Sequence, residues 1–366
     1  MAWGGGKFAI HASSQGIANM TNREPKVQRT FLLLLVGLAT LLVACGRNTD
    51  VSGSEAAYIT GTGLSPYERP VWSPDGSKLA FTEFGEIGLR DTHLVIYSLQ
   101  DKHLTSLAFT AGYYRSISWS PDGSKLVVTR VKERGKGNDI QVVDLIAQQG
   151  KTIAVGESAI WSPNGQNIAI YSGPQITGDR GDFVIQIVQP NGTLVRTISL
   201  PITPTTQGAT PVPMTVPSGE FYIPPWPSED RFGGMDWSPD SQQIVLAIQH
   251  HPSGGKPIGE LYVLDLSDDR FRPIVTSGDI YSPAWSPNGK TIAYLDGSTE
   301  AGLGGDLYLT DRAGACTMLL AAHLSAESLS WAPDSNQIVY EDGNTIFILD
   351  VKKKLASSAT PNSSCP

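Results

Sequence analysis

The chain has 366 residues, of which 40% are hydrophobic and only 17% are charged, and its formal net charge is −8. This hydrophobic fraction is too high for a disordered chain, and three Cys are too few for a disulfide scaffold or a multi-Cys zinc fold. The 38 Gly and 25 Pro make up about one residue in six, which leaves little room for long helices.

The first predicted element is an export signal. Residues 31–44 form an apolar run that follows Arg23, Lys26 and Arg29, and the run is too short to span a bilayer comfortably. It ends in Leu-Val-Ala-Cys-Gly, which resembles the bacterial lipoprotein lipobox. The resemblance implies a lipid on Cys45, with residues 1–44 removed as a leader whose alternative start is Met20. A plain secretory signal with an incidental Cys is the competing interpretation.

The mature chain is expected to begin with a flexible tether over residues 45–55. Residues 1–44 hold four basic residues and one acidic residue, so their removal changes the net charge from −8 to −11. An acidic body argues against nucleic acid as a partner and against charge-driven adhesion to anionic lipid. A lipid anchor would hold the protein at the membrane regardless of charge.

A repeated motif dominates the rest of the chain. It reads Trp-Ser-Pro or Trp-Ala-Pro, then Asp or Asn, then Gly or Ser, and it begins at Trp72, Trp119, Trp161, Trp237, Trp285 and Trp331. Successive Trp residues are 47, 42, 76, 48 and 46 positions apart. Four of these spacings match the length of a four-stranded propeller blade.

The motif has a local explanation. Pro sets the corner of a turn, Asp or Asn bonds back to its own backbone, and Gly adopts a left-handed conformation, so the segment predicts a tight connection between two strands. Apolar β-branched segments that follow each turn predict the remaining strands. Each Trp is expected to fill the seam between neighbouring blades, because one blade cannot bury both of its faces alone.

These six motifs resemble the TolB-type propeller repeat, and the resemblance covers about residues 56–351. It implies an all-β, six-bladed propeller of four-stranded antiparallel blades over residues 56–354, and it implies the fold rather than the cellular role of TolB. The last repeat lacks a fourth strand, so the strand predicted at residues 56–60 is expected to complete that blade. Residues 355–366 are expected to be a disordered tail.

The longest spacing predicts an insertion over residues 200–232, which holds eight Pro. Long loops of this kind are usually functional or disordered. Phe221, Tyr222 and Trp226 form an apolar group there that is expected to contact a partner, to cap one mouth of the ring, or simply to pack on a blade edge.

Catalytic motifs are missing from the sequence. It has no Gly-x-Ser-x-Gly elbow, no His-Glu-x-x-His and no calcium-loop spacing. His93, His103 and His323 fall in different repeats. We therefore expect no catalytic residue, no metal and no cofactor. Cys316 and Cys365 either pair outside the cytoplasm or stay as free thiols.

A ring of candidate binding residues precedes the Trp motifs by about four positions, where the inner strand of each blade is expected to begin. Its members are Glu68, Arg115, Glu157, Gly233, Tyr281 and Glu327. Around one mouth of a channel they could bind a cation or a basic peptide. The alternative is that they are ordinary solvated loop residues.

Together these features predict an exported, lipid-anchored propeller, monomeric and not an enzyme, that binds or scaffolds an envelope protein or an extracellular ligand. Rigid stacked sheets with variable loops suit recognition without catalytic groups. The alternative is a hydrolase or lyase that acts on a peptide or carbohydrate in the channel.

Overall fold

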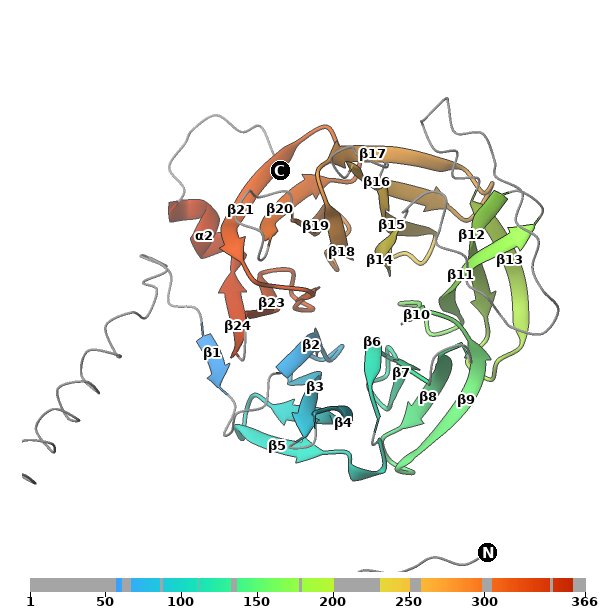
Figure 1. Ribbon diagram of the computed structural model, residues 1–366. Helices are drawn as coiled ribbons and strands as arrows, with labels where there is room; N and C mark the ends of the chain where they lie inside the picture. Colours follow the sequence, from blue (N-terminus) through green and yellow to red (C-terminus); the bar gives the residue numbers. More distant parts are fainter. Residues whose placement is uncertain are drawn as a thin grey trace, which may run out of the picture. The chain divides into compact units, whose positions relative to one another are not determined.

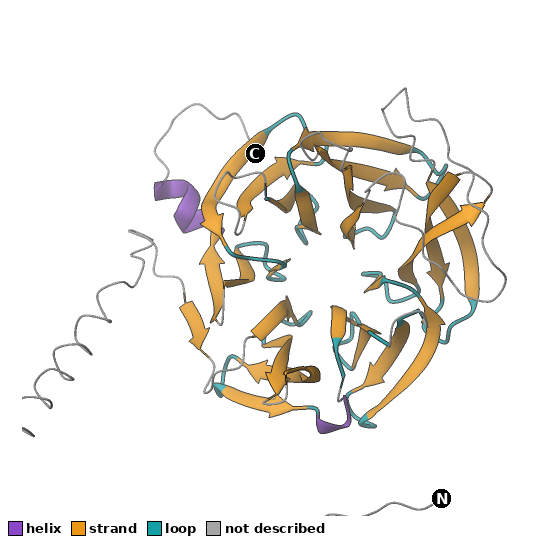
Figure 2. Ribbon diagram, in the orientation of Figure 1, coloured by secondary structure: helices purple, strands orange, loops and turns teal. Residues whose placement is uncertain are grey.

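The computed structural model describes residues 57–60, 67–85, 88–110, 112–132, 137–177, 180–200, 231–250, 258–297, 305–342 and 345–357. Contacts divide the chain into residues 1–52 and 53–366, and all described residues belong to the second unit. That unit is a ring of six four-stranded antiparallel sheets (Figures 1 and 2). The predicted six-bladed propeller is therefore confirmed.

The first three blades follow the order of the chain from the inner to the outer strand. Blade 1 comprises β2 (Tyr67–Trp72), β3 (Lys78–Gly85), β4 (Gly88–Ser98) and β5 (His103–Ser106). Blade 2 comprises β6 (Tyr114–Trp119), β7 (Lys125–Arg130), β8 (Asp139–Asp144) and β9 (Gln149–Val155). Blade 3 comprises β10 (Ser158–Trp161), β11 (Ile168–Thr177), β12 (Arg180–Val188) and β13 (Leu194–Leu200). A short 3-10 helix, η1 (Ala108–Thr110), joins blades 1 and 2.

Blades 4 and 5 repeat this order, and blade 6 closes the ring with a strand from the other end of the unit. Blade 4 comprises β14 (Arg231–Trp237), β15 (Gln243–His250), β16 (Ile258–Asp265) and β17 (Phe271–Ser277). Blade 5 comprises β18 (Ile280–Trp285), β19 (Thr291–Asp296), β20 (Gly305–Asp311) and β21 (Thr317–Leu324). Blade 6 comprises β22 (Leu329–Trp331), β23 (Gln337–Asp342), β24 (Thr345–Asp350) and β1 (Ala57–Thr60).

The pairing of β1 with β24 is antiparallel and runs from Ala57 opposite Ile348 to Thr60 opposite Thr345. The strand expected to complete the last blade, here called the clasp, is therefore present. A helix that the sequence analysis did not predict, α2 (Val351–Ser357), follows β24, so the first residues of the predicted tail are helical. Within the described residues no helix is long and apolar enough to cross a membrane.

The hydrophobic core is divided among the seams of the ring. Six clusters of buried residues each join two adjacent blades, and each contains one motif Trp. The exposed fraction of these Trp residues is 3–9%. The motif Trp residues therefore pack in the seams between neighbouring blades.

The hydrogen bonds that the motif Trp residues make across the seams alternate between two kinds. In blades 2, 4 and 6 the indole Nε1 donates to a backbone carbonyl of the preceding blade; the pairs are Trp119 with Val71, Trp237 with Ile160, and Trp331 with Ala284. In blades 1, 3 and 5 the Trp backbone N–H donates instead to a side chain of the preceding blade; the pairs are Trp72 with Ser330, Trp161 with Ser118, and Trp285 with Asp236.

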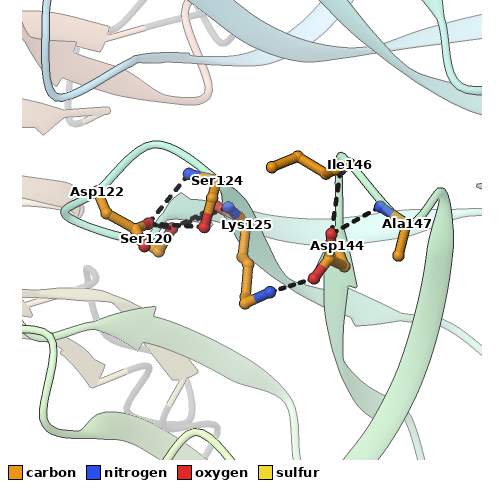
Figure 3. Close-up of polar contacts among 7 residues, drawn as sticks. All are labelled: Ser120, Asp122, Ser124, Lys125, Asp144, Ile146 and Ala147. Carbon is orange, nitrogen blue, oxygen red and sulfur yellow. Dashed lines mark hydrogen bonds and ion pairs between the residues drawn. The ribbon is translucent and has the colours of Figure 1, made fainter.

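The motif turn is the same in five blades, and Figure 3 shows it in blade 2. Ser120 Oγ donates to Asp122 Oδ1 at 2.6 Å, and the backbone N–H of Ser124 donates to the same oxygen at 3.0 Å. These bonds hold the pKa of Asp122 below its ordinary value. Beside the turn, Lys125 pairs with Asp144, which also accepts the backbone N–H groups of Ile146 and Ala147 (Figure 3).

Candidate functional site: the central channel

The inner strands of all six blades surround a central channel of about 1330 Å³. These strands run in the same direction along the channel. We call the end where they begin the first mouth, and the end where they reach the Trp-Ser-Pro turns the turn mouth. The turn mouth is lined by one Pro from each blade: Pro74, Pro121, Pro163, Pro239, Pro287 and Pro333. A Cβ atom at Gly76 would lie 3.6 Å from Pro333, so adjacent turns touch around this end.

Charge is sparse along the channel. Among the described residues that line it, the charged ones are Arg69, Arg115, Glu157, Asp236 and Glu327. Most other lining positions are Ser, Gly, Ala, Ile, Trp and Pro. Such a wall offers hydrogen bonds, aromatic surface and little steric bulk.

The predicted mouth ring is only partly gathered on the channel. Arg115, Glu157, Gly233 and Glu327 line it, whereas Glu68 and Tyr281 do not. In blades 1 and 5 the residues that follow, Arg69 and Ser282, take those places.

The physical reason is the position of a β-bulge in the inner strand. In blades 2 and 4 the bulge falls at Arg115 and Gly233 themselves, which line the channel, whereas in blades 1 and 5 it falls later. The pairing of β2 with β3 shifts register between Glu68 and Val71, and the pairing of β18 with β19 shifts between Tyr281 and Ala284. Arg69 and Ser282 have φ angles of 59° and 50°, in the left-handed region that an extra bulge residue often adopts. A bulge re-aims the neighbouring side chains, which simple alternation along a strand does not anticipate.

An ion pair spans the first mouth between blades 2 and 3. Arg115 Nη1 lies 2.7 Å from Glu157 Oε2, and the amide nitrogen of Asn138 donates to the same oxygen at 2.7 Å. The Arg115 and Glu157 side chains are 51% and 37% exposed. Water screens a pair this exposed, so its contribution to stability is small and it stays available to exchange partners.

Blades 6 and 1 form an acidic sector of the same mouth. Glu341 is 4% exposed and accepts the backbone N–H groups of Glu327 and Ser328 at 2.8 and 2.7 Å, and the Ser328 hydroxyl at 2.8 Å. Burial raises the pKa of Glu341 to about 7, although these hydrogen bonds lower it. Burial also raises the pKa of Glu68, which Arg69 lowers and Glu327 raises further.

Asp236 lies deeper, beside the fourth motif Trp. Its Oδ1 accepts the N–H of Trp237 at 2.9 Å, and its Oδ2 accepts the N–H of Trp285 at 2.7 Å. The residue lines the channel, where part of its surface stays accessible. Because protein surrounds the carboxyl group, desolvation raises the pKa of Asp236 to about 7 against the effect of both bonds.

The channel wall lacks the usual catalytic groups within the described part of the chain. No described His or Cys lines it; His93, His103 and His323 lie on β4, β5 and β21. Among the described residues no group of three or more His, Cys, Asp or Glu could hold a metal. Cys316 is disulfide-bonded, and no other Cys is among the described residues.

Several predicted sites lie outside the described residues. These are the lipidation site Cys45 and the insertion residues Phe221, Tyr222 and Trp226. Conversely, the sequence analysis did not single out Arg69, Asp236 or Glu341. A comparison of the six repeats position by position would have marked Asp236, since the other residues that precede a motif Trp are uncharged.

The fold is shared with solved structures. No protein-family model matches the chain, and no curated protein matches its sequence significantly. The structure is similar to TolB from Acinetobacter baumannii, with 22% identity, a TM-score of 0.50, and coverage of 71% of this chain and 55% of that one. The chain thus spans just over half of that protein's length.

Two further structures show the same ring. A putative TolB from Agrobacterium tumefaciens has 19% identity, a TM-score of 0.52, and coverage of 78% of this chain and 91% of that one. The tricorn protease has 14% identity, a TM-score of 0.54, and coverage of 79% of this chain and 26% of that one. At these identities the likeness establishes the fold, so the TolB-type resemblance of the repeats is confirmed at the level of architecture.

Proposed function

We propose that the chain is an exported propeller whose central channel binds a segment of another cell-envelope protein. The observation that carries this proposal is the channel wall: small polar and aromatic groups from all six blades, with few charges and no described His or Cys. Such a wall suits recognition of an extended polypeptide, because it offers hydrogen bonds and aromatic surface along the whole length of the bound segment.

Export and anchoring are the second part of the proposal. Residues 31–46 combine an apolar core, a basic flank and the lipobox-like end at Cys45. A lipid on Cys45 would hold the propeller at the extracytoplasmic face of a bacterial membrane. An exported location is consistent with the fold that the chain shares with the TolB proteins.

The anchor is tested by fractionation and mass spectrometry of the chain expressed with its own leader. We expect a diacylglycerol-sized mass shift on Cys45 and recovery in the membrane fraction, both lost in Cys45→Ser. Recovery of unmodified wild-type protein in the soluble fraction would contradict the anchor and leave the channel proposal standing.

The channel is tested by site-specific photocrosslinking in intact envelopes. A photoreactive residue in place of Ile160, which lines the channel, should capture one defined partner, whereas one at Ile146, an 85% exposed residue outside the lining, should not. Combined Glu157→Gln and Glu327→Gln, at the two carboxylates of the predicted ring that line the channel, should abolish capture from position 160. A control pair at exposed carboxylates away from the channel is Asp101→Asn and Asp268→Asn.

The alternative is a hydrolase or lyase that acts on a peptide or carbohydrate in the channel. One observation favours it: a carboxyl group with a pKa near 7, at Asp236, is typical of general acid–base catalysts. Against it, this carboxylate accepts hydrogen bonds from two backbone N–H groups, and a general acid or base normally works with a second positioned side chain. Turnover of a peptide or oligosaccharide library that Asp236→Asn abolishes would favour the enzyme.

A further inference from the structure

The residue that precedes the motif Trp occupies the same place in every blade, and only one of the six is charged. The six residues are Val71, Ser118, Ile160, Asp236, Ala284 and Ser330, and all of them line the channel. This level lies three residues, or about 10 Å along a strand, from the predicted mouth ring. Asp236 is therefore a single carboxylate inside the channel rather than part of its rim.

The seam between the blades does not require that charge. Ser118 Oγ accepts the N–H of Trp161 at 3.0 Å, and Ser330 Oγ accepts the N–H of Trp72 at 3.4 Å. These hydroxyl groups make the bond that Asp236 makes to Trp285 at 2.7 Å. Because a neutral side chain fills the structural role in the other two blades, the negative charge at Asp236 has a separate use.

No described cation on the neighbouring strands compensates this carboxylate. The strands packed against β14 are β10, β15 and β18; they carry no Lys, Arg, Asp or Glu, and their one titratable imidazole is His250, whose side chain lies outside the description. The one other titratable side chain on these strands is the Tyr281 phenol, which donates to the Ala326 carbonyl. The lining cations Arg69 and Arg115 belong to blades 1 and 2. A desolvated carboxylate without a counter-charge is costly, and a cationic ligand would relieve that cost.

We infer that Asp236 binds a primary ammonium group, carried by a lysine side chain or an amino terminus of the segment that enters the channel. This inference rests on the proposed channel function. Each carboxylate oxygen uses one acceptor site for a backbone N–H, and a carboxylate has about four such sites, so acceptor capacity remains.

An ammonium group fits this place better than other cations. A divalent metal needs several oxygen ligands, and the described residues offer no cluster of three. A guanidinium favours a carboxylate whose two oxygens are both free for a forked bond, whereas both oxygens here already accept a backbone N–H. Ammonium is a compact point charge on a slender stem.

The test is calorimetric titration of the purified full chain with short Gly/Ser peptides. The probes are an N-acetylated peptide with one lysine, the same peptide with acetyl-lysine or arginine in its place, and a lysine-free peptide with a free amino terminus. At about pH 7.5 we expect the lysine peptide to bind at least about tenfold more tightly than the acetyl-lysine peptide, equivalent to one pKa unit of interaction. Since protonation removes the charge, this preference should disappear at about pH 5.

The decisive variant is Asp236→Ser, which restores the hydroxyl found in blades 2 and 6 and so keeps the seam bond. It should lose the preference for ammonium while its unfolding midpoint stays close to that of the wild type. Adding Ser118→Asp to this variant moves the carboxylate to blade 2 and should restore the preference. A comparison of the lysine peptide with the lysine-free peptide distinguishes the two sources of the ammonium group. Tighter binding of the first assigns it to a lysine side chain, and tighter binding of the second assigns it to an amino terminus.

Equal affinities of the wild type and Asp236→Ser for the lysine peptide would overturn the inference, as would an arginine peptide that binds as tightly as the lysine peptide. The result is separable from the proposed function. Ammonium binding through Asp236 without a partner crosslinked from position 160 would uphold this inference and contradict the envelope role. A crosslinked partner that is insensitive to Asp236→Ser would do the reverse.

Discussion

The two ends of the channel are built by the same six inner strands, yet the repeat dictates only one of them. At the turn mouth, five blades carry the same bond from a Ser hydroxyl to Asp or Asn, as in Ser73 to Asp75 at 2.6 Å and Ser286 to Asn288 at 2.9 Å. At the first mouth the corresponding positions hold Glu, Arg, Gly and Tyr, and two of the six are displaced by bulges. The comparison indicates that the turns and seams maintain the ring, while the residues of the first mouth differ from blade to blade.

The strongest test of the repeat-encoded part is Trp237→Ala. This indole is 3% exposed, belongs to the core cluster between blades 3 and 4, and donates to Ile160 O at 3.3 Å. We expect a loss of about 3–5 kcal/mol in the free energy of unfolding, measured by urea denaturation, because a large cavity forms in a packed seam. Trp237→Phe is the control and should cost less. A loss under about 1 kcal/mol would mean that seam packing does not hold the ring together.

The clasp is the part of the ring that no repeat encodes. Deleting residues 46–64 removes β1, exposes the edge of β24, and strips Ile59 from the cluster between blades 6 and 1. We expect the thermal midpoint to fall by about 5 °C or more. The control deletion, residues 46–56, keeps β1 and should leave the midpoint unchanged. Equal midpoints for the two deletions would exclude a closing role for this strand.

Beneath the first mouth, Glu341→Gln tests whether a buried charge weakens that end. With a pKa raised to about 7, Glu341 binds a proton more tightly when folded, so its ionisation lowers stability as pH rises from about 4.5 to 7, and the loss persists above pH 7. The amide oxygen of Gln accepts the two backbone N–H groups, and its nitrogen donates to the Ser328 hydroxyl, which reverses the direction of that third bond. We expect the variant to gain about 1–3 kcal/mol over the wild type at about pH 8 and nothing at about pH 4.

Denaturation curves at both pH values give the result, with Glu327→Gln as the control at an exposed carboxyl group of the same blade. A variant that is less stable than the wild type at about pH 8, but not at about pH 4, would show that the Glu341 charge supports the fold.

The smallest effect on stability is expected at the exposed ion pair. Arg115→Met and Glu157→Gln should each change the free energy of unfolding by about 0.5 kcal/mol or less, because both side chains are well solvated. A double-mutant cycle measures the coupling between them. A coupling above about 1 kcal/mol would show that this ion pair stabilises the ring, as the turns and seams do, and would contradict the difference in role between the two ends.

Local chemistry explains which features the sequence predicts well. The turn at Ser120 and Asp122 is formed by residues two positions apart, and Trp119 marks a seam wherever it recurs, so the repeated pattern alone indicates the blades, their number and the closing strand. α2 is different: Asp350 caps it by accepting the backbone N–H of Lys353 at 2.8 Å, and one Asp ahead of three Lys is a weak local signal for a seven-residue helix.

The candidate site was less predictable, because it depends on contacts between blades. Whether Glu68 or Arg69 lines the channel is decided by a bulge against β3. Pro70, two residues before the motif Trp, marks this bulge, as Pro283 does in blade 5, but spacing from the Trp alone does not use that signal. Burial raises the pKa of the Glu341 carboxyl group, against the hydrogen bonds that it accepts from Ser328 and Glu327 in the segment between β21 and β22. Spacing from the motif Trp therefore locates the mouth but not every side chain that faces it.

The bonds of the motif Trp alternate around the ring between an indole-to-carbonyl bond and a backbone-to-side-chain bond. A closed ring can alternate in this way only when its number of blades is even. The smallest unit that carries both kinds of Trp bond is accordingly a pair of blades. Three tandem copies of a pair would keep the alternation, whereas a gain or loss of one blade would place two Trp bonds of the same kind next to each other.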